Sequence, residues 1–106
     1  MSPQQNELLQ RIKAEVLKIL PDAMVILYGS QARGDATPES DWDILVLTDA
    51  EVTWNLRREV WDSIYALELA SAQLIMITIR NQREWNTPPF TVTPFHHNVL
   101  REGIAI

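Results

Sequence analysis

MVILYGSQARGDATPESDWDILV, residues 24–46, joins two apolar runs through a polar segment, and the other elements of the chain are organised around it. It opens with an apolar run, Met24–Tyr28, whose length and β-branched content predict a buried strand. Gly29 breaks this run where the backbone must turn sharply or come close to a ligand. Ser30–Arg33 then predicts the first turn of a short helix. Gly29 and Ser30 would therefore lie at a helix N-terminus, where unpaired backbone N–H groups favour an anionic phosphate.

Two aspartates open the second strand of this stretch, which begins at Asp41 or Trp42 and runs to about Leu47. Because successive strand side chains point to opposite faces, Asp41 and Asp43 are expected on the same face of the sheet. Paired carboxylates suit Mg²⁺, which proteins usually hold with one or two carboxylates while substrate phosphates and water complete the coordination. The sequence therefore predicts a site for a magnesium-bound phosphate compound.

These residues resemble the signature of the DNA polymerase β-like nucleotidyltransferase superfamily, G-S-x-x-R-G followed by S-D-x-D, and its minimal bacterial members in particular. The matching positions are Gly29, Ser30, Arg33, Gly34, Ser40, Asp41 and Asp43. The resemblance implies an α/β (α+β) fold with a small mixed β-sheet flanked by helices. It also implies that Asp41 and Asp43 are catalytic and bind the metal. The residues implied to bind the nucleotide are Gly29, Ser30, Arg33 and Ser40. The ending, Pro94–Ile104, also resembles the tail of small bacterial proteins with this domain.

The resemblance implies a nucleotidyltransferase that moves a nucleoside monophosphate from a nucleoside triphosphate, bound with one or two Mg²⁺ ions, to a hydroxyl on a partner. ATP is the expected triphosphate, although the residues themselves do not distinguish it from others. The small bacterial members are often encoded beside a helical HEPN-type toxin, and some act as antitoxins that adenylylate it. Such a toxin is therefore the expected partner. The alternatives are a catalytically degenerate member that binds nucleotide or partner, and an ordinary α/β interaction module.

A third carboxylate on the next core strand is typical of active family members, and this chain departs from that pattern. The corresponding strand, AQLIMITI at residues 72–79, contains no Asp or Glu. Gln73 or a neighbour is expected at that position, and a neutral amide cannot act as a base near neutral pH. Turnover therefore stays open. The possible sources of a substitute carboxylate are Asp35, Glu39, Glu68, Glu84 or a partner.

The composition sets limits on the class of protein. A chain of 106 residues is expected to form one nucleotidyltransferase domain, 1–106, because it is too short for a separate acceptor-recognition domain. The formal net charge of −5 argues against binding of duplex nucleic acid, and the lack of cysteine excludes disulfides and thiolate chemistry. There is no signal-peptide pattern, and no apolar run approaches the roughly 18 residues of a membrane span. We expect a cytoplasmic protein without a membrane partner.

The remaining elements follow from periodicity and end signals. Ser2 and Gln5 form a capping box for a first helix that ends at Pro21. Thr48 with Glu51 has the same spacing, so a second long helix is expected to begin between residues 49 and 53 and to reach about residue 69. The other predicted elements are a buried strand, Leu74–Ile79, a helical turn, Asn81–Trp85, and a last helix, Phe95–Glu102.

The second long helix carries two adjacent apolar stripes. Its main stripe is expected in the core. For the other stripe, deep packing is expected and a partner surface is the alternative. The residues of this other stripe are Trp54, Trp61, Tyr65 and Leu69.

Overall fold

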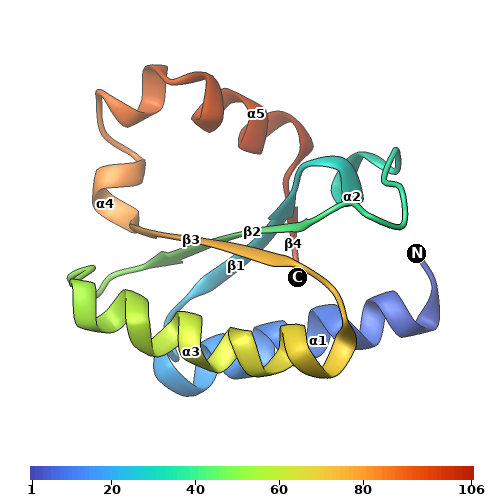
Figure 1. Ribbon diagram of the computed structural model, residues 1–106. Helices are drawn as coiled ribbons and strands as arrows, with labels where there is room; N and C mark the ends of the chain where they lie inside the picture. The colour runs from blue at the N-terminus through green and yellow to red at the C-terminus, as the bar shows by residue number, and fades with distance from the viewer.

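The computed structural model describes residues 1–106 and is built on a four-stranded sheet with the order β3-β2-β1-β4 (Figure 1). β1 (Met24–Tyr28) pairs antiparallel with β2 (Trp42–Thr48) and with β4 (Ile104–Ala105). β3 (Ile75–Asn81) runs parallel to β2. The predicted mixed sheet is therefore confirmed, and its centre is formed by the two strands of the signature stretch.

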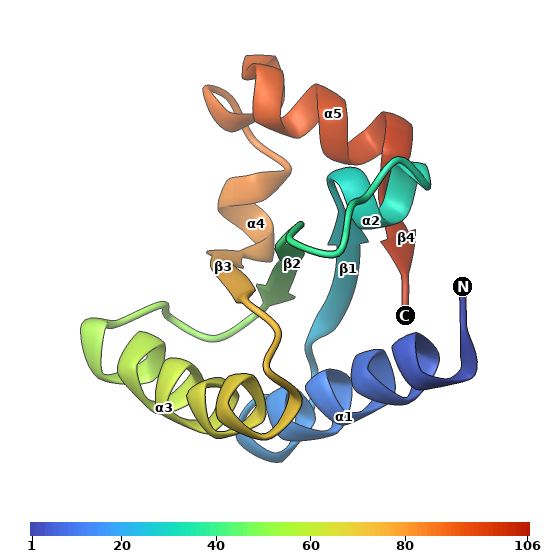
Figure 2. The same ribbon diagram turned by 45° about the vertical axis from the view of Figure 1, so that its right-hand side comes forward.

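Helices cover both faces of the sheet, as Figures 1 and 2 show. α1 (Pro3–Ile19) and α3 (Trp54–Ser71) lie on one face, whereas α4 (Gln82–Trp85) and α5 (Pro94–Glu102) arch over the other. α2 (Ser30–Arg33) follows β1 directly, as predicted. None of the helices combines the length and the apolar character that crossing a bilayer requires.

β2 is the central strand, and its side chains enter two different cores. Ile44 and Val46 belong to the larger core, under α1 and α3, whereas Leu45 and Leu47 pack in a smaller cluster with residues of α4 and α5. Strand alternation therefore places Asp43 on the face that α4 and α5 cover. The members of the larger core are Leu8, Leu9, Ile12, Val16, Leu20, Val25, Leu27, Trp42, Ile44, Val46, Val60, Ile64, Leu67, Ile75 and Ile79.

The predicted capping box of α1 is present. The Ser2 hydroxyl accepts from the Gln5 N–H at 3.1 Å, and the Gln5 side chain accepts from the Ser2 N–H at 2.8 Å. Asn81 caps α4 through its side-chain oxygen, and Thr93 caps α5. These ends were predictable because each cap lies within three residues of the groups that it satisfies.

The predicted capping pair of α3, Thr48 with Glu51, was wrong, although the helix begins only one residue beyond the predicted range. Thr48 is the last residue of β2 and is fully buried, and its hydroxyl donates to the Asp22 carboxylate at 3.1 Å. The helix begins instead at Trp54, where the Thr53 hydroxyl accepts from the Leu56 N–H at 3.1 Å. The burial of β2 up to its last residue keeps Thr48 in the sheet, although its spacing to Glu51 matches a capping box.

The third strand differs from the prediction in its position in the sheet. β3 lies at an edge, with Leu74 and Met76 exposed, and it continues to Asn81. The two-residue strand β4 at the opposite edge was not predicted. A strand of this length carries no periodic signal, and it forms because Gly103 lets the chain turn from α5 to lie beside Ile26.

Deep packing of the second stripe of α3 was also wrong. The exposed fractions are 64% for Trp54, 40% for Trp61, 59% for Tyr65 and 68% for Leu69. The sheet and α1 cover only the opposite side of the helix, which includes Val60, Ile64 and Leu67. α3 lies at one side of the molecule, and no further element covers its outer surface (Figure 2).

Candidate functional site

Gly29 forms the turn between β1 and α2. Its φ of +77° lies in a region that only glycine adopts readily. A Cβ atom at this position would also collide with the carboxylate of Asp43. Glycine is therefore required both by the backbone conformation and by the space available. The absence of a side chain lets the start of α2 lie directly against an acidic group of β2.

Asp41 and Asp43 lie at the start of β2, beside this turn. Asp43 is paired in register with Tyr28, the last residue of β1. Burial, followed by the negative charge of Asp41, raises the pKa of Asp43, whereas the nearby charge of Arg33 opposes the rise. The structure thus brings together the two carboxylates that the spacing predicted to share one face.

Neither aspartate is paired with a cation of the protein. The ion pairs of the chain join Lys18 to Glu15, and Arg33 to Asp35 and Glu102. Two neighbouring carboxylates that repel one another and lack a cationic partner fit a divalent metal. Asp41 and Asp43 form a pair only, because no group of three His, Cys, Asp or Glu side chains in the chain could hold a metal.

Glu102, the last residue of α5, is a site residue that the sequence reasoning missed. Its Oε1 accepts from the Gly29 N–H at 3.0 Å, and Arg33 Nη1 donates to both of its carboxylate oxygens at 3.2 Å. The Glu102 side chain is only 11% exposed. A negative charge at a helix C-terminus is disfavoured by the helix dipole, and this local conflict was the available signal.

The predicted nucleotide-binding residues occupy different places around the turn. Ser30 is the first residue of α2, next to Gly29. Arg33 lies at the end of α2 and bridges Asp35 and Glu102. The Ser40 hydroxyl accepts from the Thr37 N–H at 2.8 Å and so closes the loop that precedes Asp41. Ser40 is thus placed to position that loop.

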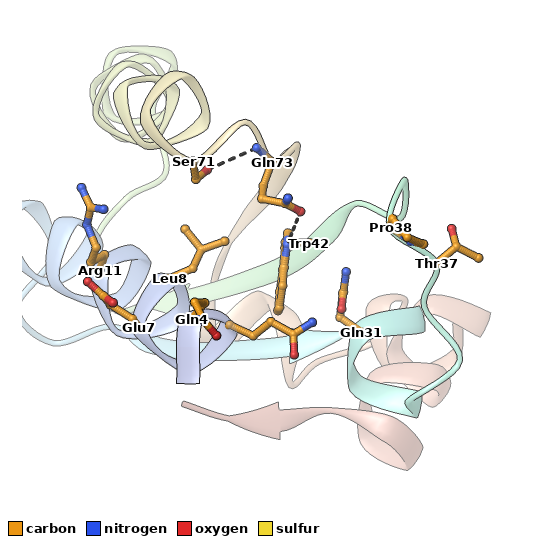
Figure 3. Close-up of a pocket in the computed structure, with 11 residues that line it drawn as sticks. Gln4, Glu7, Leu8, Arg11, Gln31, Thr37, Pro38, Trp42, Ser71 and Gln73 are labelled. Atoms are coloured by element: carbon orange, nitrogen blue, oxygen red, sulfur yellow. Dashed lines mark hydrogen bonds between the residues drawn. The ribbon is translucent and has the colours of Figure 1, made fainter. Parts of the chain in front are cut away.

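The expectation for Gln73 was wrong. Gln73 precedes β3, and its Oε1 accepts from Trp42 Nε1 at 3.1 Å on the face that α1 and α3 cover (Figure 3). The strand register places Met76 beside Asp43 instead. The difference arises because β3 begins only at Ile75, so the strand face that carries Asp43 continues with Met76 and Thr78.

The four carboxylates that could replace the missing third acidic residue lie in different parts of the structure. Glu68 lies on α3, which covers the opposite face of the sheet, and accepts from the Ile75 N–H at 2.9 Å. Glu84 follows β3 and lies at the far end of the sheet. Asp35 and Glu39 are exposed on the loop between α2 and β2, and Asp35 is paired with Arg33.

A pocket of about 420 Å³ opens on the other side of the same loop (Figure 3). Four glutamine side chains contribute to its lining, together with the Trp42 ring. Because the side chain of Trp42 points away from those of its neighbours Asp41 and Asp43, the pocket and the carboxylate pair lie on opposite sides of β2. The glutamines are Gln4, Gln5, Gln31 and Gln73.

Comparison with protein families and known sequences gives consistent matches. The family described as "Nucleotidyltransferase domain" matches residues 9–94. MJ0604 of Methanocaldococcus jannaschii, named as a candidate protein adenylyltransferase, is 37% identical over 79 residues, which cover 74% of this chain and 72% of that protein. MJ0141 of the same organism carries the same description and is 38% identical over 56 residues, or 51% of this chain and 57% of that protein.

Solved structures with a similar fold come from toxin–antitoxin complexes. A chain of a toxin–antitoxin crystal structure with AMP-PNP has a TM-score of 0.65 and 21% identity, covering 91% of this chain and 69% of that one. A chain of the complex between tri-AMPylated Shewanella oneidensis HEPN toxin and MNT antitoxin has a TM-score of 0.62 and 20% identity, covering 95% and 70%. At these identities the likeness concerns the fold.

Proposed function

This chain belongs to the nucleotidyltransferase domain family, and we propose that it moves a nucleoside monophosphate from a nucleoside triphosphate to a hydroxyl on a partner protein. The observation that carries the proposal is the contact between the Gly29 turn and the Asp43 carboxylate. This contact puts the start of a helix and a pair of acidic metal ligands at one place. A phosphate chain bound at the start of the helix would therefore lie close to a cation bound by the two aspartates.

Asp41 and Asp43 are the residues that would hold Mg²⁺. Burial, followed by the charge of Asp41, raises the pKa of Asp43, and neither aspartate has a cationic partner, which fits a divalent ion between them. When bound, the ion supplies neutralisation and orientation of the triphosphate. Ser30 would donate its hydroxyl hydrogen bond to a phosphate oxygen, and Arg33 would add positive charge nearby.

The Gly29 N–H is bonded to Glu102, so it becomes available to a phosphate only when that carboxylate withdraws. Arg33, which contacts the same carboxylate, would then be free to turn towards the phosphate. In the transfer itself, the acceptor oxygen attacks the α-phosphorus, the bond to the bridging oxygen breaks, and pyrophosphate leaves. Positioning of the reactants is the main task of the protein in such a reaction.

A second candidate function is binding of nucleotide without turnover. The observation that favours it is the half-exposed Met76 beside Asp43, because a thioether can neither bind Mg²⁺ strongly nor remove the acceptor proton. Of the four carboxylates that the sequence suggested, Asp35 and Glu39 remain as candidates for a base, since Glu68 and Glu84 lie elsewhere in the fold.

We propose ATP as the donor and a HEPN-type toxin as the acceptor. The names of the M. jannaschii relatives and the toxin–antitoxin complexes of similar fold support this assignment. Because the reaction consumes a nucleoside triphosphate, we place it in the cytoplasm.

A growth assay tests the proposed antitoxin role. The proposed HEPN-type toxin would be expressed with the wild type, with the Asp41→Asn/Asp43→Asn pair, or with the exposed-residue control Asp62→Asn. We expect growth with the wild type and the control, together with an adenylylated partner in intact mass spectra. Equal rescue by the aspartate pair, with an unmodified partner, would support binding without turnover.

A further inference from the structure

His96 is a buried titratable side chain that the proposed reaction does not use. It lies in the first turn of α5 and is only 6% exposed, and its ring stacks on the Trp85 ring with the centroids 4.6 Å apart. Both ring nitrogens, Nδ1 and Nε2, are buried and lack a hydrogen-bond partner. Because a neutral imidazole carries one N–H donor and one acceptor, two polar groups stay unpaired while α5 lies on the sheet. Such unpaired burial lowers the stability of this arrangement.

A protonated His96 fits this place less well than a neutral one. None of the ion pairs of the chain includes His96, and burial of an unpaired charge costs more free energy than burial of an unpaired neutral group. The helix dipole adds to this effect, because the first turn of a helix disfavours a positive charge. The Trp85 ring offers a cation–π contact, which does not replace hydrogen bonds to two N–H donors. Protonation therefore favours a state in which α5 leaves the sheet.

The other titratable groups around α5 do not neutralise a charge on His96. They lie on β1, α2, β2, β3, α4 and α5 itself, and none of them forms a hydrogen bond with the imidazole. The ring of His97 is 6.5 Å away between centroids, and this side chain is exposed. The groups are Tyr28, Arg33, Asp43, Arg80, Arg83, Glu84, His97, Arg101 and Glu102.

α5 links His96 to the turn that we assign to a phosphate. His96, Val99 and Glu102 recur at intervals of three residues, so they share the side of the helix that faces the sheet. Glu102 accepts from the Gly29 N–H at 3.0 Å and is contacted by Arg33. Figures 1 and 2 show this end of α5 beside α2. The dipole disfavours a negative charge at this end and a positive charge at the other, so both ionised groups destabilise the helix.

Few contacts oppose a movement of α5 away from the sheet. The helix has 9 residues, and only His96 and Val99 among them are buried. β4, which follows α5, is a strand of 2 residues at the edge of the sheet. Short elements with little buried apolar surface open at a low cost in free energy. The balance between the docked and the released helix is therefore sensitive to a single buried charge.

We propose that α5 is an autoinhibitory helix that protonation of His96 releases. The inference rests on the proposed function, because the regulated event is the access of a triphosphate to the Gly29 turn. While α5 is docked, the Glu102 carboxylate accepts from the Gly29 N–H and holds Arg33. When His96 takes up a proton from solvent, α5 moves and carries Glu102 with it, so both donors become available to a phosphate. Histidine titrates between about pH 5 and pH 8, so this switch acts near neutral pH.

Titration calorimetry with Mg²⁺-ATP at about pH 6 and about pH 8 tests the proposal. His96→Phe keeps a ring of similar size beside Trp85 and cannot take up a proton. We expect the affinity of the wild type, relative to His96→Phe, to rise about threefold to tenfold on going to the lower pH, since the apparent affinity follows the fraction of released helix. Protonation of ATP affects both proteins equally and cancels in this ratio.

Two further variants show whether the effect passes through the proposed contacts. His97→Gln, a change at the exposed neighbour, should behave as the wild type does. In a Glu102→Gln background, His96→Phe should leave the pH dependence unchanged, because the competing carboxylate is already absent. A pH dependence that needs His97, or that His96→Phe still alters without Glu102, would contradict the proposed link.

Amide hydrogen exchange of Gly29 tests the release without nucleotide. At about pH 6 the Gly29 N–H should exchange at least about threefold faster in the wild type than in His96→Phe, because its bond to Glu102 opens with α5. If this difference is present and ATP does not bind, the proposed function fails while the switch is supported. Equal exchange in the two proteins, or an affinity ratio that does not change with pH, would overturn the proposal.

Discussion

The Gly29 N–H donates a hydrogen bond of 3.0 Å to Glu102 Oε1, across 73 positions of the sequence. The bond joins the turn of the signature stretch to the last residue of α5. The Glu102 carboxylate, with Arg33 as its counter-ion, thus accepts from the backbone N–H that we propose as a phosphate donor. Nucleotide binding therefore requires a competing anion of the same chain to move.

Glu102→Gln should strengthen binding of Mg²⁺-ATP. The change removes a negative charge beside the triphosphate and weakens the hold of this side chain on Arg33. We expect an affinity gain of about threefold to tenfold, the size of a partly screened charge interaction. Titration calorimetry measures it, with the exposed Glu59→Gln on α3 as the matched control. A tenfold loss of affinity would mean that Glu102 supports the bound state instead.

ATP binding should require a divalent cation. Asp41 and Asp43 repel the triphosphate unless a cation lies between them, because no cationic side chain is bonded to either. In calorimetry, EDTA should abolish the binding heat, and Asp43→Asn should reduce the affinity in Mg²⁺ by at least tenfold. Equal affinity in EDTA and in Mg²⁺ would show that the aspartates do not act through a metal.

The stability gain from Asp43→Asn should grow with pH. Burial and the charge of Asp41 raise the pKa of Asp43 above its ordinary value of 3.8, so the folded state binds its proton more tightly than the unfolded chain does. The wild type therefore loses free energy of unfolding as the pH rises from about 4 through the raised pKa. The variant lacks this loss, and its advantage should stay below about 1 kcal/mol because the carboxylate is partly solvated.

Urea melts of both proteins without metal, from about pH 3 to pH 7, measure this difference. The pKa values of Glu15 and Asp22 are lowered by hydrogen bonds, from Ser63 and from the Asp49 N–H respectively, and they destabilise the protein in acid. These contributions are common to both proteins and cancel in the comparison. A difference that is constant or that falls with pH would contradict the raised pKa of Asp43.

Gly29→Ala and Gly34→Ala should have different effects on binding. Both glycines have positive φ angles, +77° and +83°, so each substitution should cost about 1–2 kcal/mol of backbone strain. A Cβ at Gly34 meets no atom, whereas one at Gly29 displaces the Asp43 carboxylate. Gly29→Ala should therefore lose the larger free energy of unfolding and should also lose binding of Mg²⁺-ATP. Equal losses in the two variants would show that the contact with Asp43 has no functional role.

The sequence predicted the elements that depend on neighbouring residues. β1, α2 and β2 follow from an apolar run, a glycine and a second apolar run, and the caps of α1 and α4 lie within one turn of their helices. Asp41 and Asp43 were placed together for the same reason, because strand alternation is a local rule.

The features that the sequence did not predict depend on which elements become neighbours. The exposure of the second apolar stripe of α3 depends on which elements pack beside that helix. The place of β3 at an edge of the sheet likewise depends on the order of the strands. The position of Met76 beside Asp43 depends on the register between two strands. The place of Glu102 at a helix C-terminus is a local signal for that residue, but its contact with Gly29 joins positions 73 apart and depends on how α5 packs.

Two differently labelled forms of ATP test directly whether the protein transfers a nucleotidyl group. Wild-type protein, Mg²⁺ and the HEPN-type toxin that we propose as its acceptor would be incubated with ATP labelled at either the α- or the γ-phosphate. Nucleotidyl transfer predicts that the α-label becomes attached to the toxin, that the γ-label leaves in pyrophosphate, and that Asp41→Asn/Asp43→Asn abolishes both. Attachment of the γ-label, or attachment of the α-label that persists in the aspartate pair, would contradict nucleotidyl transfer at Asp41 and Asp43.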